Sequence, residues 1–200
     1  MPSDFPLRCR CGHVRGIAGE VSPSTGFRFV CYCTDCQAFT RFLDRADVLD
    51  GAGGTDIFQL PPGRVKLTAG ADALRCVNLG NRGVFRWYSD CCRTPIANTA
   101  GPRFPVIGMI HSFMDHAADG RSRDDVLGAP LCRIFERSAT GPLPACAPPP
   151  PSFGLYVRRG PALLGWWWRG LARPNPFFDD HTGAPLSAPR VITASERAAL

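Results

Sequence analysis

The sequence predicts a mainly β protein made of small antiparallel sheets, and three observations support this fold class. The 200-residue chain is 44% hydrophobic and 20% charged, so it is not a wholly disordered polypeptide. It contains 21 Gly and 20 Pro, which is too many for a helical bundle. Short runs of strand-forming residues alternate with turn sequences, as in antiparallel sheets. The length fits one domain with an appendage rather than two large domains.

Turns and short apolar runs alternate in the first part of the chain. Residues 27–30 are expected to form a strand that leads into Cys31. Residues 34–43 are expected to form a helix, because Thr34 and Gln37 fit the capping-box pattern. The apolar residues at helical spacing are Cys36, Phe39, Phe42 and Leu43. The helix therefore begins inside a cluster of cysteines and turns one face towards a core.

Six later segments are rich in strand-forming residues. They are separated by turn sequences such as Pro-Pro-Gly, Ala-Gly-Ala and Gly-Asn-Arg-Gly. This alternation of strand-forming and turn sequences is typical of strands that pair in antiparallel order. The expected strands are residues 56–60, 64–68, 73–79, 83–88, 105–113 and 131–135. We expect the sheet domain to end near Glu136.

A proline-rich connector at 137–152 separates the sheet domain from a C-terminal extension at 153–200. Proline fixes φ and removes a backbone donor, so the connector should be stiff and extended. In the extension, residues 161–171 could form a short helix that carries three consecutive tryptophans. We expect these aromatic side chains to pack on the sheet domain or on a second copy of the chain. The alternatives, through residues 153–178, are a protein partner or a helix at a membrane interface.

The charge distribution and the N-terminal sequence indicate which binding partners and which cellular compartment to expect. The formal net charge is +6, but 22 of the 23 cationic residues are scattered arginines, so no nucleic-acid footprint is expected. The N-terminus has no basic start and no apolar run, so it does not resemble a signal peptide. No stretch approaches the ~20 apolar residues of a transmembrane helix. We therefore expect a cytoplasmic protein, in which metal binding or catalysis explains clustered cysteines better than disulfides do.

Seven of the ten cysteines fall in three tight groups. They are Cys9 with Cys11, Cys31 with Cys33 and Cys36, and Cys91 with Cys92. In an extended segment, residues two apart point to the same side, so each Cys-x-Cys pair presents two thiols in one direction. Cys36 would join its two neighbours from the first turn of the helix, whose N-terminus favours thiolates. Such a strand-turn-helix step can supply three of the converging thiolates that zinc requires.

The spacing favours two zinc sites over one. Cys9 and Cys11 need partners from a distant part of the chain, and Cys91 and Cys92 are the obvious pair. A closed site with four ligands would be structural. The remaining three, Cys31, Cys33 and Cys36, have no adjacent fourth ligand, which is the ligand count of a catalytic zinc with an open position.

Three blocks of sequence carry a resemblance to a known family. They are residues 9–16 (CRCGHVRG), 31–37 (CYCTDCQ) and 86–95 (RWYSDCCRTP). In order and spacing they resemble the signature blocks of the glutathione-dependent formaldehyde-activating enzyme family, which includes centromere protein V. The resemblance covers residues 7–136 and suggests a divergent bacterial branch with an added extension. It implies a β-tent fold, a structural zinc on the first and third blocks, and a second zinc on the middle block.

The third block departs from that family's pattern. The family has Arg-x-Phe-Cys-x-x-Cys-Gly-Thr, whereas Ser89 stands at the first Cys position and Arg93 replaces the Gly. Cys92 aligns with the last cysteine. Cys91 could supply the missing thiolate only through a local turn, because neighbours in an extended chain point opposite ways. His13 or a water molecule are the alternative fourth ligands.

The resemblance implies a zinc-dependent carbon-sulfur lyase that adds a thiol such as glutathione to formaldehyde or another small aldehyde. Cys31, Cys33 and Cys36 would hold the metal, and the sequence identifies no catalytic residue. One alternative is a non-catalytic, zinc-stabilised module whose aromatic tail binds a partner. Another is a redox protein that exchanges thiols at the same three cysteines.

Five further residues with reactive side chains carry no prediction of function. Isolated cysteines are usually buried and inert, and isolated histidines are usually hydrogen-bonded surface or core residues. Nothing in the sequence brings the two histidines to the clustered cysteines. These residues are Cys76, Cys132, Cys146, His111 and His116.

Overall fold

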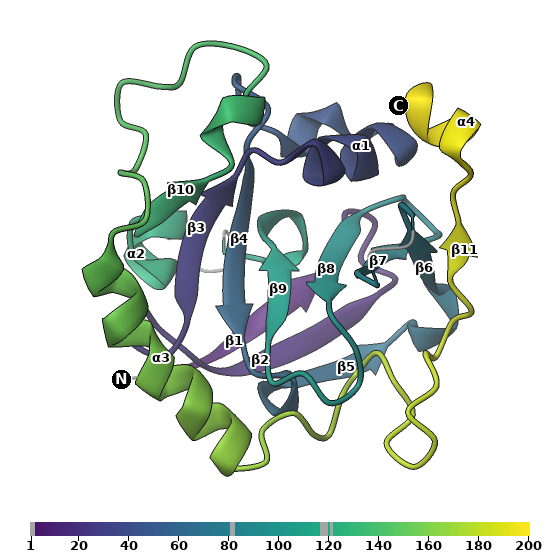
Figure 1. Ribbon diagram of the computed structural model, residues 1–200. Helices are drawn as coiled ribbons and strands as arrows, with labels where there is room; N and C mark the ends of the chain where they lie inside the picture. The colour runs from purple at the N-terminus through teal and green to yellow at the C-terminus, as the bar shows by residue number, and fades with distance from the viewer. Residues whose placement is uncertain (1–2, 81–82, 117–119, 121) are drawn as a thin grey trace.

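Two β-sheets form the body of the protein (Figure 1). The computed structural model describes residues 3–80, 83–116, 120 and 122–200. The first sheet has three antiparallel strands in the order β1-β2-β5. Its strands are β1 (Ser3–Arg8), β2 (Arg15–Val21) and β5 (Val65–Ala69). The expected mainly β class with small antiparallel sheets is thereby confirmed.

The second sheet has eight strands in the order β10-β3-β4-β9-β8-β7-β6-β11, and only its two edge strands pair in parallel. The strands are β3 (Phe27–Cys31), β4 (Thr55–Leu60), β6 (Leu74–Asn78), β7 (Phe85–Ser89), β8 (Pro95–Thr99), β9 (Ile107–Ile110), β10 (Cys132–Ile134) and β11 (Arg190–Val191). The expected strands at 27–30, 56–60, 64–68, 73–79, 83–88, 105–113 and 131–135 all correspond to observed ones.

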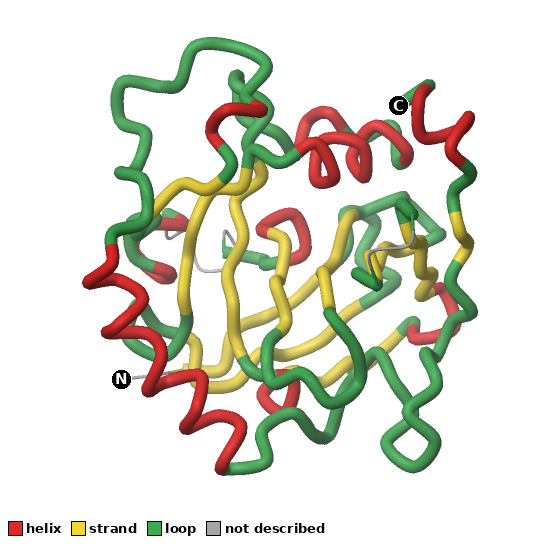
Figure 2. Tube along the Cα trace, viewed as in Figure 1, coloured by secondary structure: helices red, strands yellow, loops and turns green. Residues whose placement is uncertain are grey.

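Helices lie at the periphery of the two sheets (Figure 2). They are α1 (Thr34–Phe42), α2 (Arg123–Leu127), α3 (Phe153–Trp168) and α4 (Ala194–Ala198). The helix α1, which the sequence predicted at 34–43, begins within the middle cysteine group. Within the described part of the chain, no helix combines the length and apolar character that crossing a bilayer requires.

The main core fills the space between the two sheets. Phe5 of β1, Phe58 of β4 and Trp87 of β7 belong to one cluster of buried side chains. Trp87 is fully buried, and its indole N–H donates to the Thr99 hydroxyl at 2.9 Å. A second cluster joins α1, through Phe39, to strands β6, β7 and β9 of the large sheet. Both sheets and α1 therefore hold the cysteine-bearing segments in fixed positions.

The C-terminal extension packs on the same core. Phe177 is fully buried and stacks on Trp87 with ring centroids 5.0 Å apart. Strand β11 pairs with β6, and Ile192 after it joins the buried cluster of Phe39. The division at 7–136, 137–152 and 153–200 stays a prediction, but residues of the extension complete the hydrophobic core of the domain.

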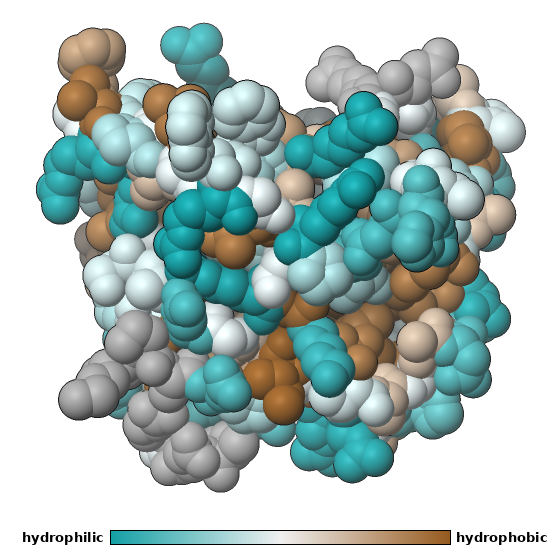
Figure 3. Space-filling view, turned by 90° about the horizontal axis from the view of Figure 1, so that it is seen from below, coloured by the Kyte–Doolittle hydropathy of each residue, from teal (hydrophilic) through white to brown (hydrophobic). Residues whose placement is uncertain are grey.

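Helix α3 is longer than the sequence indicated and begins earlier. It spans Phe153–Trp168 rather than 161–171, and Pro161 lies inside it instead of near its first turn. Ser152 is the N-cap, and its hydroxyl accepts the backbone N–H of Leu155 at 3.3 Å. The cap explains the earlier start of the helix, which continues past the exposed proline to Trp168. The face of the molecule seen from below mixes hydrophobic and hydrophilic residues (Figure 3).

Candidate metal centres

Four cysteine sulfurs converge where the turn after β1 meets the turn between β7 and β8. The sulfur atoms of Cys9, Cys11, Cys91 and Cys92 lie within 4.8 Å of one another. Cys11 to Cys91 is 3.3 Å, Cys9 to Cys11 is 3.6 Å and Cys9 to Cys91 is 3.8 Å. A tetrahedral zinc with 2.3 Å bonds sets its sulfurs about 3.8 Å apart. The four sulfurs therefore fit a metal ion of this kind without rearrangement of the backbone.

A tight turn, rather than an extended strand, brings Cys9 and Cys11 together. The Gly12 N–H donates to the Cys9 carbonyl at 2.8 Å, and Gly12 has φ 79°, where a side chain is disfavoured. The Val14 N–H then donates to the Cys9 sulfur at 3.3 Å. This bond favours a thiolate at Cys9 and fixes its direction.

A second turn allows the adjacent Cys91 and Cys92 to face the same centre. Residues 90–92 form a turn after β7, and Arg93 has φ 54°, a left-handed conformation that an Arg seldom adopts. The Arg93 guanidinium donates to the carbonyls of Phe42 at 2.6 Å and Leu43 at 3.1 Å, at the end of α1. These bonds hold the turn in place, and the turn lets Cys91 join Cys92 in the cluster.

Ser89 contacts the cluster through Cys92. Its hydroxyl oxygen accepts the Thr94 N–H at 3.1 Å, so the hydroxyl proton is free to point at the Cys92 sulfur 3.3 Å away. The Thr94 hydroxyl, 3.1 Å from the same sulfur, accepts N–H groups from Arg10 and Arg45. With both acceptor positions used, its proton is also directed to Cys92.

These hydrogen bonds make Cys92 more acidic than an ordinary thiol. Burial alone would raise the pKa of Cys92, but the bonds from Ser89 and Thr94 outweigh it and lower the pKa to about 5. Burial and the hydrogen bond with Cys11 raise the pKa of Cys91 to about 12. One thiolate is therefore present at neutral pH before any metal enters.

Three further sulfurs meet at the junction of β3 and α1. The sulfurs of Cys31, Cys33 and Cys36 lie within 4.8 Å of one another, and Cys31 to Cys36 is 3.8 Å. The N-cap of α1 is Cys33, whose sulfur accepts the Cys36 N–H at 3.4 Å. The expected capping box is therefore wrong: the Gln37 amide instead donates to the carbonyls of Tyr32 and Ser138, both at 2.8 Å.

Hydrogen bonds among the three sulfurs of this second group favour a thiolate on Cys33. Hydrogen bonds from Cys31 and Cys36 lower the pKa of Cys33 to about 2, and the charge of Arg86 acts in the same direction. Hydrogen bonds with Cys33 and Cys36, together with burial, raise the pKa of Cys31. Cys33 therefore carries a thiolate to which its neighbours donate, at the N-terminus of a helix, where negative charge is stabilised.

A buried arginine lies against this second group. Arg86 of β7 is about 4% exposed, and its Nη1 is 3.8 Å from the Cys36 sulfur and 3.1 Å from the Asn98 side-chain oxygen. Its Nη2 is 3.5 Å from Asp35, which also pairs with Arg197. A cavity of about 270 Å³ begins at this arginine. Its lining comprises Thr34, Asp35, Leu79, Gly80, Val84, Arg86 and Arg197.

The other candidate residues do not join either group. All ten cysteines are free, and Cys76, Cys132 and Cys146 lie outside both clusters. His13 is also outside and lies 3.9 Å from Asp72. His111 and His116 line a different cavity, of about 250 Å³, that also borders Cys9. Among the described residues, no fourth Cys, His, Asp or Glu completes the group of Cys31, Cys33 and Cys36.

The two groups thus offer different chemistry to a metal ion. Four sulfurs can surround a tetrahedral ion completely, which is typical of a structural site. Three sulfurs leave one position for an exogenous ligand. The sequence identified the seven cysteines but not the roles of Arg86, Ser89 and Thr94. These three residues lie in the block at 86–95, and only the folded chain shows which sulfur each of them contacts.

Comparisons with known proteins place the chain without naming an activity. A family profile described as "Family of unknown function (DUF6151)" matches residues 1–187. No curated protein matches the sequence. A crystal structure of a Rhodobacter sphaeroides protein is similar, with 15% identity and a TM-score of 0.42, over 60% of this chain and 94% of that one. A likeness this distant carries no argument about function.

Proposed function

The chain belongs to the DUF6151 family of unknown function, and we propose that it is a zinc-binding protein with one structural and one substrate-binding metal site. The observation that carries this proposal is the contrast between the two cysteine groups. One has four converging sulfurs, and the other has three beside a buried guanidinium and a polar cavity. Ligand counts of four and three distinguish structural from catalytic zinc sites.

The first site, at Cys9, Cys11, Cys91 and Cys92, would be structural. It ties the turn after β1 to the turn between β7 and β8, two segments that are far apart in the sequence. Cross-links of this type stabilise small β domains with many turns. Hydrogen bonds from Ser89, Thr94 and Val14 to the ligand sulfurs support the thiolate form.

The second site, at Cys31, Cys33 and Cys36, would bind a small thiol. Zinc held by three thiolates with an open position binds an incoming thiol as its thiolate. Three thiolates and Zn²⁺ carry a net charge of −1, which Arg86 offsets from within the protein. The neighbouring cavity has Arg86, Arg197 and the Asp35 that pairs with both on its wall, and these charges suit a thiol that carries charged groups of its own.

The reaction we propose is addition of that thiol to formaldehyde or a similarly small aldehyde. A carbon-sulfur bond forms, the carbonyl π electrons move to oxygen, and the oxygen takes up the proton that the thiol gave up. Arg86, on the wall of the cavity, is placed to stabilise the developing negative charge. Resemblance to the glutathione-dependent formaldehyde-activating family supports glutathione as the thiol.

Cobalt substitution tests the open position. In the cobalt-loaded protein, added glutathione should change the ligand-field spectrum of one of two ions, since a new sulfur ligand enters one site only. The change should persist in Cys11→Ser, disappear in Cys33→Ser and be unaffected in Cys146→Ser, a control outside both groups. NMR should show that formaldehyde and glutathione form their adduct faster with the protein than spontaneously. A spectrum that no thiol alters would overturn the substrate-binding assignment.

A non-catalytic module is the second candidate function. The exposed aromatic face of α3 favours it, because such a face is a binding feature that contains none of the clustered cysteines. Under this alternative, both metals bind, glutathione has no effect on either site, and the only activity is binding through α3.

A further inference from the structure

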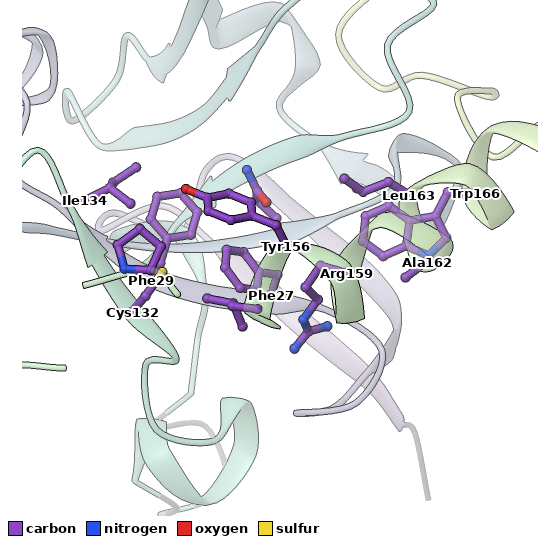
Figure 4. Close-up of a pocket in the computed structure, with 12 residues that line it drawn as sticks. Phe27, Phe29, Cys132, Ile134, Tyr156, Arg159, Ala162, Leu163 and Trp166 are labelled. Atoms are coloured by element: carbon purple, nitrogen blue, oxygen red, sulfur yellow. The ribbon is translucent and has the colours of Figure 1, made fainter. Parts of the chain in front are cut away.

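Helix α3 carries two different apolar stripes, one on each side. Leu155, Ala162 and Trp166, spaced by seven and four residues, face the body of the protein and line an apolar cavity of about 240 Å³ (Figure 4). The opposite wall comes from Phe27 and Phe29 of β3, with Cys132 and Ile134 of β10. Trp166 is buried there, so one of the three consecutive tryptophans faces the core.

The outer stripe runs along the whole helix. Phe153, Val157, Leu164, Trp167 and Trp168 recur at helical spacing and are exposed by 83%, 57%, 68%, 64% and 86%. At 100° per residue they fall within an arc of roughly 100°. From Phe153 to Trp168 the stripe is roughly 22 Å long at 1.5 Å per residue. Isolated exposed apolar residues need no explanation, but a continuous stripe of this size indicates a binding surface.

The stripe cannot turn inward, because the other side of α3 is already fixed. Arg159 donates to the Gly26 carbonyl at 2.7 Å, and its guanidinium lies 5.0 Å from the centre of the Phe27 ring. Together with buried Trp166, these contacts set the rotation of the helix about its axis. In Figure 1, α3 lies on the outside of the molecule beside β3 and β10. The stripe is therefore a preformed, convex surface.

Charge identifies the kind of partner. Between Glu136 and Asp179 the sequence has no acidic residue and five arginines. Arg158 and Arg169 are exposed and lie eleven residues apart on one side of α3, between the outer stripe and the inner one and nearer to the inner one, and neither forms an ion pair with any described residue. A surface with exposed tryptophans, a flank of unpaired arginines and no carboxylate is complementary to the acyl chains and phosphates of anionic lipid.

We propose that α3 is an interfacial membrane-binding helix that docks the protein on anionic lipid. The aromatic stripe would lie in the boundary between headgroups and acyl chains, parallel to the membrane plane. Arg158 and Arg169 would reach the phosphates from the flank. With 16 residues and an internal proline, α3 lies on a bilayer rather than crossing it. Because this surface is separate from the cysteines, the inference does not depend on the proposed metal chemistry.

Vesicle flotation with the full-length, zinc-loaded protein tests this inference. The protein should float with vesicles of phosphatidylcholine and phosphatidylserine, bind vesicles of phosphatidylcholine alone more weakly, and dissociate as salt is raised. Brominated acyl chains should quench its tryptophan fluorescence, since the stripe tryptophans would sit among them. The double variant Trp167→Ser/Trp168→Ser should weaken binding by about tenfold or more. The double variant Arg158→Gln/Arg169→Gln should lose about fivefold per arginine, on anionic vesicles only.

Controls separate lipid binding from unfolding and from protein contacts. Phe104→Ser removes an exposed aromatic residue elsewhere on the surface and should leave flotation unchanged. Each variant should keep the wild-type circular dichroism spectrum and metal content. Failure of the wild type to float, or flotation that the stripe variants do not alter, would overturn the proposal. So would a dimer that forms through the stripe and is abolished by Trp167→Ser/Trp168→Ser, because the occupant would then be a second copy of the chain.

Discussion

Ser89 lies 3.3 Å from the sulfur of Cys92 and is positioned to donate its hydroxyl proton to it. Four sulfurs converge beside this serine, because the turn after β7 brings Cys91 to the same cluster as Cys92. Ser89 is therefore a hydrogen-bond donor to a sulfur of the cluster. Ser89 is fully buried, so its hydroxyl has no competing water.

Loss of the Ser89 hydroxyl should weaken metal binding without abolishing it. We expect Ser89→Ala to lower the zinc affinity of the first site about tenfold, because donors to a ligand sulfur typically contribute a factor of 10 to 100. Competition with a chromophoric chelator measures this affinity. Thr99→Ala, which removes a buried hydroxyl bonded to Trp87, is the matched control. An affinity equal to that of the wild type would show that the hydrogen bond has no such role.

Arg86 should matter for the second site only. We expect Arg86→Met to reduce metal affinity at Cys31, Cys33 and Cys36 by about tenfold or more, since the thiolates lose their buried cation. Arg86→Lys should recover part of the affinity. Arg75→Met, at a half-exposed arginine on the neighbouring strand, provides the control. Cobalt titration, read at the two sites separately, distinguishes these outcomes, and an equal effect on both sites would contradict the assignment.

Removing Phe177 should destabilise the whole domain. The side chain is fully buried on Trp87, so Phe177→Ala should cost about 3 to 5 kcal/mol of unfolding free energy. Phe104→Ala, at an exposed ring, should change it by no more than about 0.5 kcal/mol. Denaturant unfolding at fixed zinc concentration gives both values. A stable Phe177→Ala protein would mean that the extension is energetically separate from the sheets.

Acid stability should depend on Asp56. Burial alone would raise its pKa, but Arg28 and Arg123, with nitrogens 2.7 Å from its carboxylate, outweigh burial and hold the pKa below its usual range. A carboxyl with a lowered folded-state pKa contributes stability that is present above its unfolded pKa and is lost as pH falls through the folded one.

We therefore expect Asp56→Asn to be less stable than the wild type by about 3 kcal/mol at neutral pH. The difference should begin to shrink below about pH 4, where the carboxyl of the unfolded wild type becomes protonated, and should shrink further as pH falls through the lower pKa of the folded state. The difference between the unfolding free energies of the two proteins, measured at each pH, cancels effects that they share, such as metal release in acid. A difference that does not vary with pH would refute the charge-based explanation.

Local geometry explains why the sequence predicted much of the candidate sites. The convergence of Cys31, Cys33 and Cys36 follows from a strand end, a turn and the first turn of a helix, all within six residues. The sequence predicted Cys91 as a ligand only on condition of a local turn, and that turn could not be predicted, because it requires Arg93 in a left-handed conformation that favours glycine. Bonds from Arg93 to the end of α1, formed only in the folded chain, hold that turn.

The strands that the sequence did not indicate have weak local signals. β1 contains Pro6, β2 contains two glycines and β8 begins with Pro95, and all these residues lower strand propensity. β11 is two residues long and is defined only by its pairing with β6. Arg86 was likewise not identified as a site residue, because the packing of the large sheet against α1, not sequence spacing, brings it to Cys36.

Metal content tests the central claim, that two cysteine groups hold two separate ions. Elemental analysis of the freshly purified, reduced protein by mass spectrometry should find two zinc ions per chain. Cys11→Ser and Cys33→Ser should each retain one, because each removes a ligand from a different group. Cys146→Ser should retain both. A wild-type protein without bound metal, whose clustered cysteines readily form disulfides, would contradict the account.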